Sequence, residues 1–147
     1  MGELLRRLWQ LQALEVEVLR SEFDTGGYDL VLGFHKIVRH IQFKSSLVTS
    51  STAEQSISLK LGDKPSGCIV WVVVKPDLTF SHFLWFGGLP GEPLPCISNY
   101  PVTKQARANA QGFKADRPDH RRISKGKFTR LDTLDQVVVR LFDIATD

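Results

Sequence analysis

The chain has 147 residues, a length that predicts one globular domain over residues 1–147. Its composition, 42% hydrophobic and 24% charged, argues against extended disorder. The longest apolar run, 68–74, is too short to span a bilayer, so we expect no membrane partner and a cytoplasmic location. The two cysteines, Cys68 and Cys96, have no second Cys or His at ligand spacing, which favours reduced thiols over a zinc site.

The N-terminal part of the chain predicts a helix followed by a strand. Residues 3–13 place leucines at helical spacing and form an amphipathic helix. Residues 15–23 alternate apolar and charged side chains, as a first strand would, and 24–27 form a Gly-rich turn. We expect Asp24 to bond its own backbone in this turn, with a supporting role beside a site as the alternative.

Segment 28–46 predicts two short strands joined by a tight turn at 33–36. Side chains alternate between the faces of a strand, so folding this hairpin brings Asp29 level with the region around Gln42. Lys44 lies on the same face of the second strand as Gln42. An acid, an amide and an ammonium group would then meet, which is costly in a core unless they are paired or bind an ion.

Asp29, followed by Gln42-Phe-Lys44, resembles the core motif of the PD-(D/E)XK nuclease superfamily, in a variant where Gln replaces the second acid. Tyr28 stands where the family name has Pro. The order of elements over residues 2–75 agrees with this resemblance, because a helix with an early Glu precedes a first strand, the Asp strand and the Lys strand. The resemblance implies an α/β fold of the restriction endonuclease type, with a central mixed sheet of about four to five strands flanked by helices.

The resemblance also implies a chemistry, namely metal-dependent hydrolysis of phosphodiester bonds in DNA. Mg²⁺ or Mn²⁺ would be held by Asp29 and the side-chain carbonyl of Gln42, and Lys44 would orient the attacking water or stabilise developing charge. These three residues form the expected catalytic set. Glu3 corresponds to a helical acid that leans towards the metal; alternatively it favours the helix dipole and pairs with Arg7.

Two alternatives to catalysis stay open. Asp29 and Lys44 can form a partly buried ion pair with a structural role only. The chain would then be a catalytically inactive nuclease-like domain that binds nucleic acid or a protein partner. The resemblance also admits a homodimer, because many such nucleases pair to cut both strands.

The middle of the chain mixes loop-like and strand-like segments. Residues 45–58 are rich in Ser and Thr and predict a loop beside the site. Within 54–63 the apolar alternation favours a strand, whereas the resembling fold has a helix, so both stay open. The apolar run at 68–75 predicts a strand buried on both faces, which implies helices on both sides of the sheet. Residues 78–86 predict another strand.

The C-terminal third begins with an irregular segment. Repeated Gly and Pro at 87–95 predict a long loop that could line a substrate groove, and 102–111 predicts a short helix. Thr133 and Gln136 form a capping-box pattern before an apolar face, which predicts a final helix.

Positive charge is concentrated between positions 104 and 130. This segment holds nine Lys or Arg against two Asp, an excess of seven in a chain whose net charge is +3. Such an excess attracts a polyanion, so we expect DNA as a partner, while a solvated basic loop is the alternative. The residues expected to contact nucleic acid are Arg117, Arg121, Arg122, Lys125 and Lys127.

Overall fold

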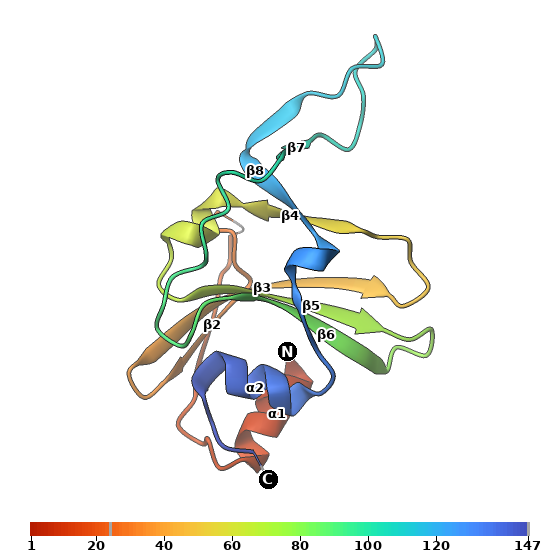
Figure 1. Ribbon diagram of the computed structural model, residues 1–147. Coiled ribbons are helices and arrows are strands. Elements are labelled where there is room, and N and C mark those ends of the chain that lie inside the picture. Colours follow the sequence, from red (N-terminus) through yellow and green to blue (C-terminus); the bar gives the residue numbers. More distant parts are fainter. Residues whose placement is uncertain (24, 147) are drawn as a thin grey trace.

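The computed structural model describes residues 1–23 and 25–146, so the predicted turn role of Asp24 lies outside the described residues. Figure 1 shows two sheets and a pair of helices stacked in layers. The helices are α1 (Gly2–Gln10) and α2 (Leu134–Phe142), with short 3₁₀ turns at η1 (Leu59–Asp63) and η2 (Lys125–Lys127). The strands are β1 (Glu17–Arg20), β2 (Leu30–Phe34), β3 (Ile37–Leu47), β4 (Glu54–Ser58), β5 (Gly67–Val74), β6 (Phe80–Gly87), β7 (Val102–Lys104), β8 (Asp116–Ser124) and β9 (Thr129–Leu131).

The larger sheet has six strands in the order β1-β2-β3-β5-β6-β9. Only β3 and β5 run parallel, and the other neighbours are antiparallel, so the sheet is mixed. A separate antiparallel sheet has the order β4-β8-β7. The predicted α/β class with a mixed sheet is confirmed, but the structure is richer in strands than expected and the main sheet is larger than about four to five strands.

The helices α1 and α2 cover one face of the six-stranded sheet (Figure 1). Leu8 of α1 and Leu141 of α2 are fully buried there, against Ile41 of β3 and Cys68 of β5. The capping box that begins α2 is present as predicted, because the Thr133 hydroxyl accepts from the backbone N–H of Gln136 and the Gln136 side chain accepts from the Thr133 N–H.

The opposite face of the sheet is covered by strands and loop. Trp71 of β5 is fully buried there against Ile57 of β4 and Ile123 of β8, and the segment 88–101 adds Leu94 and Ile97. The predicted buried strand is therefore confirmed, but the inference of helices on both sides is wrong. A strand buried on both faces needs two apolar covers, and a second sheet provides one as well as a helix does.

Two segments differ from their predictions. Residues 45–58 were expected to be a loop, yet β3 continues to Leu47 and β4 begins at Glu54. Residues 102–111 were expected to be helical, but β7 occupies Val102–Lys104 and a turn follows. Within 54–63 the strand interpretation holds for β4, and η1 follows it as a short 3₁₀ turn.

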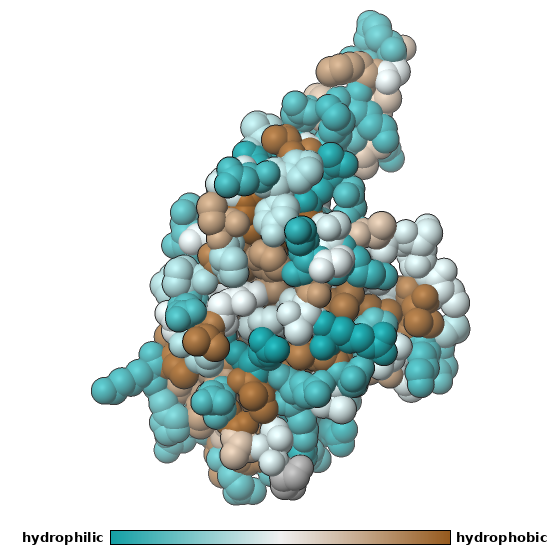
Figure 2. Space-filling model, viewed as in Figure 1, coloured by the Kyte–Doolittle hydropathy of each residue, from teal (hydrophilic) through white to brown (hydrophobic). Residues whose placement is uncertain are grey.

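The connection between β7 and β8 extends away from the rest of the molecule (Figure 1). Its surface is mainly hydrophilic in Figure 2, and it carries the exposed side chains of Arg107 and Lys114. Phe113, near its tip, is 64% exposed. Part of the basic segment therefore projects into solvent on a two-stranded arm.

Candidate active site between the two sheets

The β2–β3 hairpin brings Asp29 and Gln42 together, as the alternation predicts. The strands pair with Leu30 opposite Ile41, and the Asp29 N–H donates to the Ile41 carbonyl at 2.8 Å. Asp29 Oδ2 accepts from Gln42 Nε2 at 2.7 Å and from the backbone N–H of Phe43 at 2.8 Å. The exposed acid and the half-buried amide thus form one hydrogen-bonded unit at the start of β2.

The orientation of the Gln42 amide follows from its neighbours. Nε2 donates to Asp29 Oδ2 and lies 3.2 Å from the Phe43 carbonyl, and both of these oxygens are acceptors. Only the NH₂ end of the amide can face two acceptors. Oε1 is therefore the end that remains for a donor or a cation.

Lys44 and Gln42 line a pocket of about 320 Å³ between β3 and the three-stranded sheet. The strand alternation places them on the side of β3 opposite Ile41, as predicted. Asp29 is bonded to Gln42 but is absent from the described lining. The other lining residues that the structure describes are Thr25, Gly27, Ser56, Ser58, Lys60, Arg117, Asp119 and His120.

Strand β3 forms one wall of this pocket, and β4, η1 and β8 form the second wall. Gly27 lets the turn before β2 lie close against this second wall. Its φ is +73°, and a Cβ there would lie 2.9 Å from Ser58 Cβ and 3.3 Å from the Leu61 nitrogen. Glycine alone accepts both the backbone angle and the close approach. Ser58 in turn caps η1, since its Oγ accepts from the Lys60 N–H at 3.2 Å.

The second wall contains residues that sequence reasoning did not assign to the site, above all Lys60 and His120. His120 lies opposite Ser58 in the β4–β8 ladder. Asp119 Oδ1 lies 3.0 Å from His120 Nδ1, and this hydrogen bond holds the pKa of Asp119 below its usual range. No local pattern marks these residues, because β8, which carries His120, reaches the pocket by pairing with β4 about sixty residues earlier, and Lys60 lies in η1 directly after β4.

His40, which shares the β3 face of Gln42, has a packing role. Its Nδ1 lies 2.7 Å from the Pro65 carbonyl, and its ring contacts the Tyr28 ring edge-on at a centroid distance of 4.9 Å. These contacts join β3 to the turns that precede β2 and β5. His40 is not among the residues that line the pocket.

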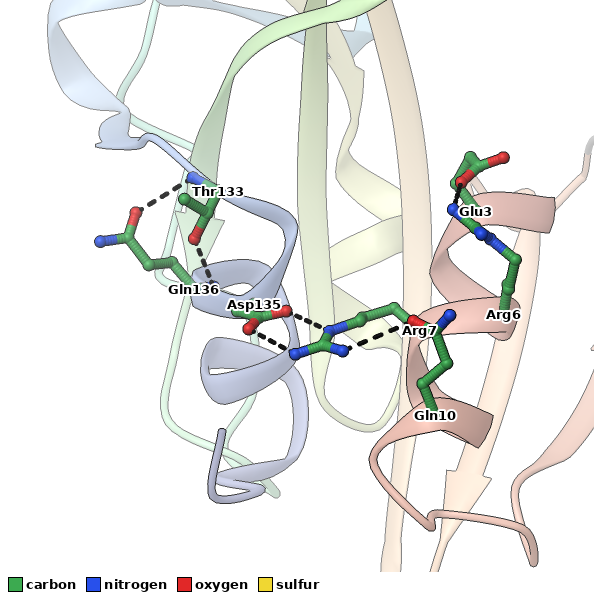
Figure 3. Close-up of polar contacts among 7 residues, drawn as sticks. All are labelled: Glu3, Arg6, Arg7, Gln10, Thr133, Asp135 and Gln136. Carbon is green, nitrogen blue, oxygen red and sulfur yellow. Dashed lines mark hydrogen bonds and ion pairs between the residues drawn. The ribbon is translucent and has the colours of Figure 1, made fainter. Parts of the chain in front are cut away.

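Glu3 lies away from this site. It belongs to α1, which packs on the helix-covered face, and Figure 3 shows it paired with Arg6 at 2.8 Å. Arg7, the other expected partner of Glu3, binds Asp135 of α2 through two hydrogen bonds of 2.5 and 2.8 Å (Figure 3). The structure therefore does not bring Glu3 to Asp29 and Gln42.

The basic segment divides into structural and exposed members. Arg121 donates to the backbone carbonyls of Ser98, Pro118 and His120. Arg122 reaches Glu54 at 3.5 Å, and the Lys125 ammonium lies 5.2 Å from the centre of the Trp71 ring. Arg117 lines the pocket, and Lys127 is exposed on η2.

The oxygen atoms of Asp29 and Gln42 define what cation the site would suit. Asp29 Oδ1 and Gln42 Oε1 take part in no hydrogen bond among the described residues, and hard cations such as Mg²⁺ prefer oxygen ligands. The pair carries a single negative charge. Within residues 1–23 and 25–146 no group of three or more His, Cys, Asp or Glu is arranged to hold a metal. These donors fit a weakly held cation that needs further ligands.

Comparisons with protein-family models and with curated proteins give no match for this chain. In the part of the chain that the structure describes, none of the helices has the length and apolar character needed to cross a membrane.

Proposed function

We propose that this protein hydrolyses phosphodiester bonds in DNA with Mg²⁺ or Mn²⁺, at the site formed by Asp29, Gln42 and Lys44. The observation that carries the proposal is the Asp29–Gln42 unit, whose amide lines the same pocket as Lys44. The order of α1, β1, the Asp strand, the Lys strand and the buried β5 is the order on which the PD-(D/E)XK resemblance rests.

Each residue has a distinct role in this proposal. Asp29 Oδ1 and Gln42 Oε1 would hold the cation, while the Phe43 N–H keeps the Asp29 carboxylate in position through Oδ2. A cation held by these oxygens would polarise the phosphate and lower the pKa of a bound water. The Lys44 ammonium would orient that water or stabilise the charge that develops on the phosphate. With one carboxylate, the site would need further ligands for a cation, and the substrate phosphate could supply one.

A plasmid cleavage assay tests this function. The wild type should nick or cut supercoiled DNA with Mg²⁺ or Mn²⁺ and not with EDTA. Asp29→Ala and Lys44→Ala should each lower the rate by roughly a hundredfold or more, as loss of a group that stabilises the transition state does. Asp63→Ala and Lys36→Ala are matched controls, because both residues are exposed and neither lines the pocket. Full cleavage by either site variant would remove that residue from the mechanism.

Gln42→Glu probes the cation site without requiring turnover. The change places a second carboxylate against Asp29 Oδ2, where the amide N–H now donates at 2.7 Å. Without a cation the two carboxylates repel each other, so the variant should unfold at a lower temperature than the wild type. Mn²⁺ should raise the unfolding temperature of the variant again. In calorimetry without DNA, Mn²⁺ should bind more tightly to the variant than to the wild type. Gln42→Ala should bind the cation more weakly, and equal affinity in all three proteins would exclude Gln42 as a ligand.

A second candidate function is a nuclease-like domain that binds nucleic acid or a protein partner without cutting. It is favoured by the neutral Gln42 and by the two hydrogen bonds that already engage Asp29 Oδ2. Under this alternative, DNA binding would be intact while no divalent cation supports cleavage. The same assay, read alongside a binding measurement, separates the two functions.

Binding to DNA should depend on the exposed part of the basic segment. Arg107, Lys114 and Lys127 are exposed. Lys125 is exposed too, but its ammonium contacts the Trp71 ring, and Arg121 donates to backbone carbonyls. Replacing Arg107, Lys114 and Lys127 together with Gln should weaken binding to all sequences and flatten its dependence on salt. Circular dichroism checks that the variant is folded. An unchanged salt slope would locate the DNA contacts elsewhere.

A further inference from the structure

The pocket between the two sheets has its own electrostatic character. Three of the described lining residues are cationic, namely Lys44, Lys60 and Arg117, against one carboxylate, Asp119. Its volume of about 320 Å³ lies at the lower end of the range for pockets that hold small ligands. Ser56 and Ser58 add hydroxyl groups to its lining. A small anionic group is the ligand that such a lining favours.

The hydrogen bonds of His120 define its tautomer and hold Arg117 in place. The guanidinium can only donate, and Arg117 Nη2 lies 3.1 Å from His120 Nε2, so Nε2 accepts. Asp119 accepts from Nδ1 at 3.0 Å, so Nδ1 carries the proton. With Nδ1 donating to Asp119 and Nε2 accepting from Arg117, the His120 ring connects these two residues. This chain of contacts orients the Arg117 guanidinium at the pocket.

We propose that this pocket binds a phosphate group of a nucleic-acid strand, with Arg117 and Lys60 as its cationic contacts and His120 as the residue that positions Arg117. The guanidinium offers several N–H donors in a plane, which suits phosphate oxygens. Lys60 enters from η1 and Arg117 from β8, so the phosphate would be held from two elements of the second wall. The inference rests on the proposed function only for the source of the phosphate, since the binding itself needs no metal and no catalysis.

Calorimetry in EDTA tests the inference independently of cleavage. The probe is a short oligothymidylate with a 5′-phosphate, compared with the same oligonucleotide ending in a 5′-hydroxyl. Tighter binding of the phosphorylated form identifies a terminal monoester as the ligand, and equal binding identifies an internal diester. Arg117→Gln and Lys60→Gln should each weaken binding roughly tenfold, as loss of one charge-assisted contact does.

Arg140→Gln is the matched control, because it removes the same charge from an exposed arginine of α2, outside the basic segment and outside the pocket lining. The affinity of this control variant for the oligonucleotide should change less than about twofold, because the removed charge is distant and screened by salt. Equal losses for Arg140→Gln and Arg117→Gln would overturn the inference and indicate general attraction of DNA to the positive charge of the protein. Undiminished binding by both Arg117→Gln and Lys60→Gln would overturn it as well.

The positioning role of His120 has a separate readout. In His120→Gln the side-chain oxygen can accept from Arg117 in place of Nε2, whereas His120→Leu offers no acceptor. We expect His120→Leu to weaken oligonucleotide binding and His120→Gln to restore most of it, at similar unfolding temperatures. Equal binding by both variants would exclude the positioning role. A protein that binds the oligonucleotide through these residues but cuts no DNA would retain the pocket and lose the proposed nuclease activity.

Discussion

The two faces of the six-stranded sheet differ in what covers them, although strand β3 supplies side chains to both. On the helix side, Arg39 is fully buried next to an apolar core. On the other side, Gln42 and Lys44 line a polar pocket. The same alternation of residues therefore produces a closed core on one face and a candidate site on the other. The difference comes from the elements that cover each face. The two helices pack against an apolar core on their face, whereas the three-stranded sheet leaves a pocket next to β3.

The two faces also satisfy their charges differently. The Arg39 guanidinium donates to the carbonyls of Arg140 and Leu141 at the end of α2, and to that of Gly88, at 2.7 to 3.0 Å. It thereby neutralises the negative end of the α2 dipole. Asp29, on the other face, is exposed, and its Oδ1 takes part in no hydrogen bond with the residues that the structure describes. Arg39, bound to backbone carbonyls, therefore stabilises the fold, whereas Asp29 retains an oxygen that could bind a cation.

Arg39→Met should have the largest effect, and on the helix side. The change leaves three carbonyls without their donor, so we expect a loss of about 2–4 kcal/mol in the free energy of unfolding. Chemical denaturation measures this loss. Burial raises the pKa of Cys68 to about 12, so this thiol should resist alkylation in the folded wild type. It should react faster in the variant, because a less stable protein unfolds more often and exposes the thiol. Arg140→Met is the control, because its side chain is exposed, and a loss of equal size there would contradict the role of Arg39.

Gly27→Ala should have an intermediate effect, on the pocket side. The positive φ and the contact with Ser58 predict a loss of about 1–3 kcal/mol. Because Gly27 lines the pocket, oligonucleotide binding should weaken together with stability. Gly62→Ala is the control, since a Cβ there has no heavy atom within 4 Å. Equal stability of the two alanine variants would show that the turn adapts.

Asp135→Asn should have the smallest effect, about 1 kcal/mol, because the Arg7–Asp135 pair joins α1 and α2 near the surface (Figure 3). The hydrogen bonds from Arg7 lower the pKa of Asp135. A carboxyl whose pKa is lower in the folded state contributes stability above its unfolded pKa of about 4 and loses it as the pH falls through the folded value. The variant should therefore lose less stability than the wild type on acidification below about pH 4.

Thermal unfolding as a function of pH measures this difference. Asp132→Asn is the control, because Asp132 pairs with Arg130 on the exposed side of the same region and that pair does not join the two helices. We expect the control to keep the acid dependence of the wild type. A parallel pH profile for Asp135→Asn and the wild type would show that the helix pair does not depend on this carboxylate.

Local patterns in the sequence determined the parts of this protein whose interactions are local. The alternation along β2 and β3 brought Asp29 to Gln42, because a two-residue connection at 35–36 leaves little choice of register. The capping box at Thr133 and Gln136 marked the start of α2, because its hydrogen bonds span one helical turn. The apolar run of β5 predicted a strand buried on both faces.

Only the tertiary structure decided what covers the second face and what completes the pocket. Ser58 of β4 pairs with His120 of β8 across more than sixty residues, and no local pattern encodes that register. The Ser- and Thr-rich composition of segment 45–58 predicted a loop, whereas its strand character comes from pairing partners that the composition does not show. Lys60 and His120 entered the site in the same way. Strand pairing between distant segments depends on the whole fold, and so does any site built on it.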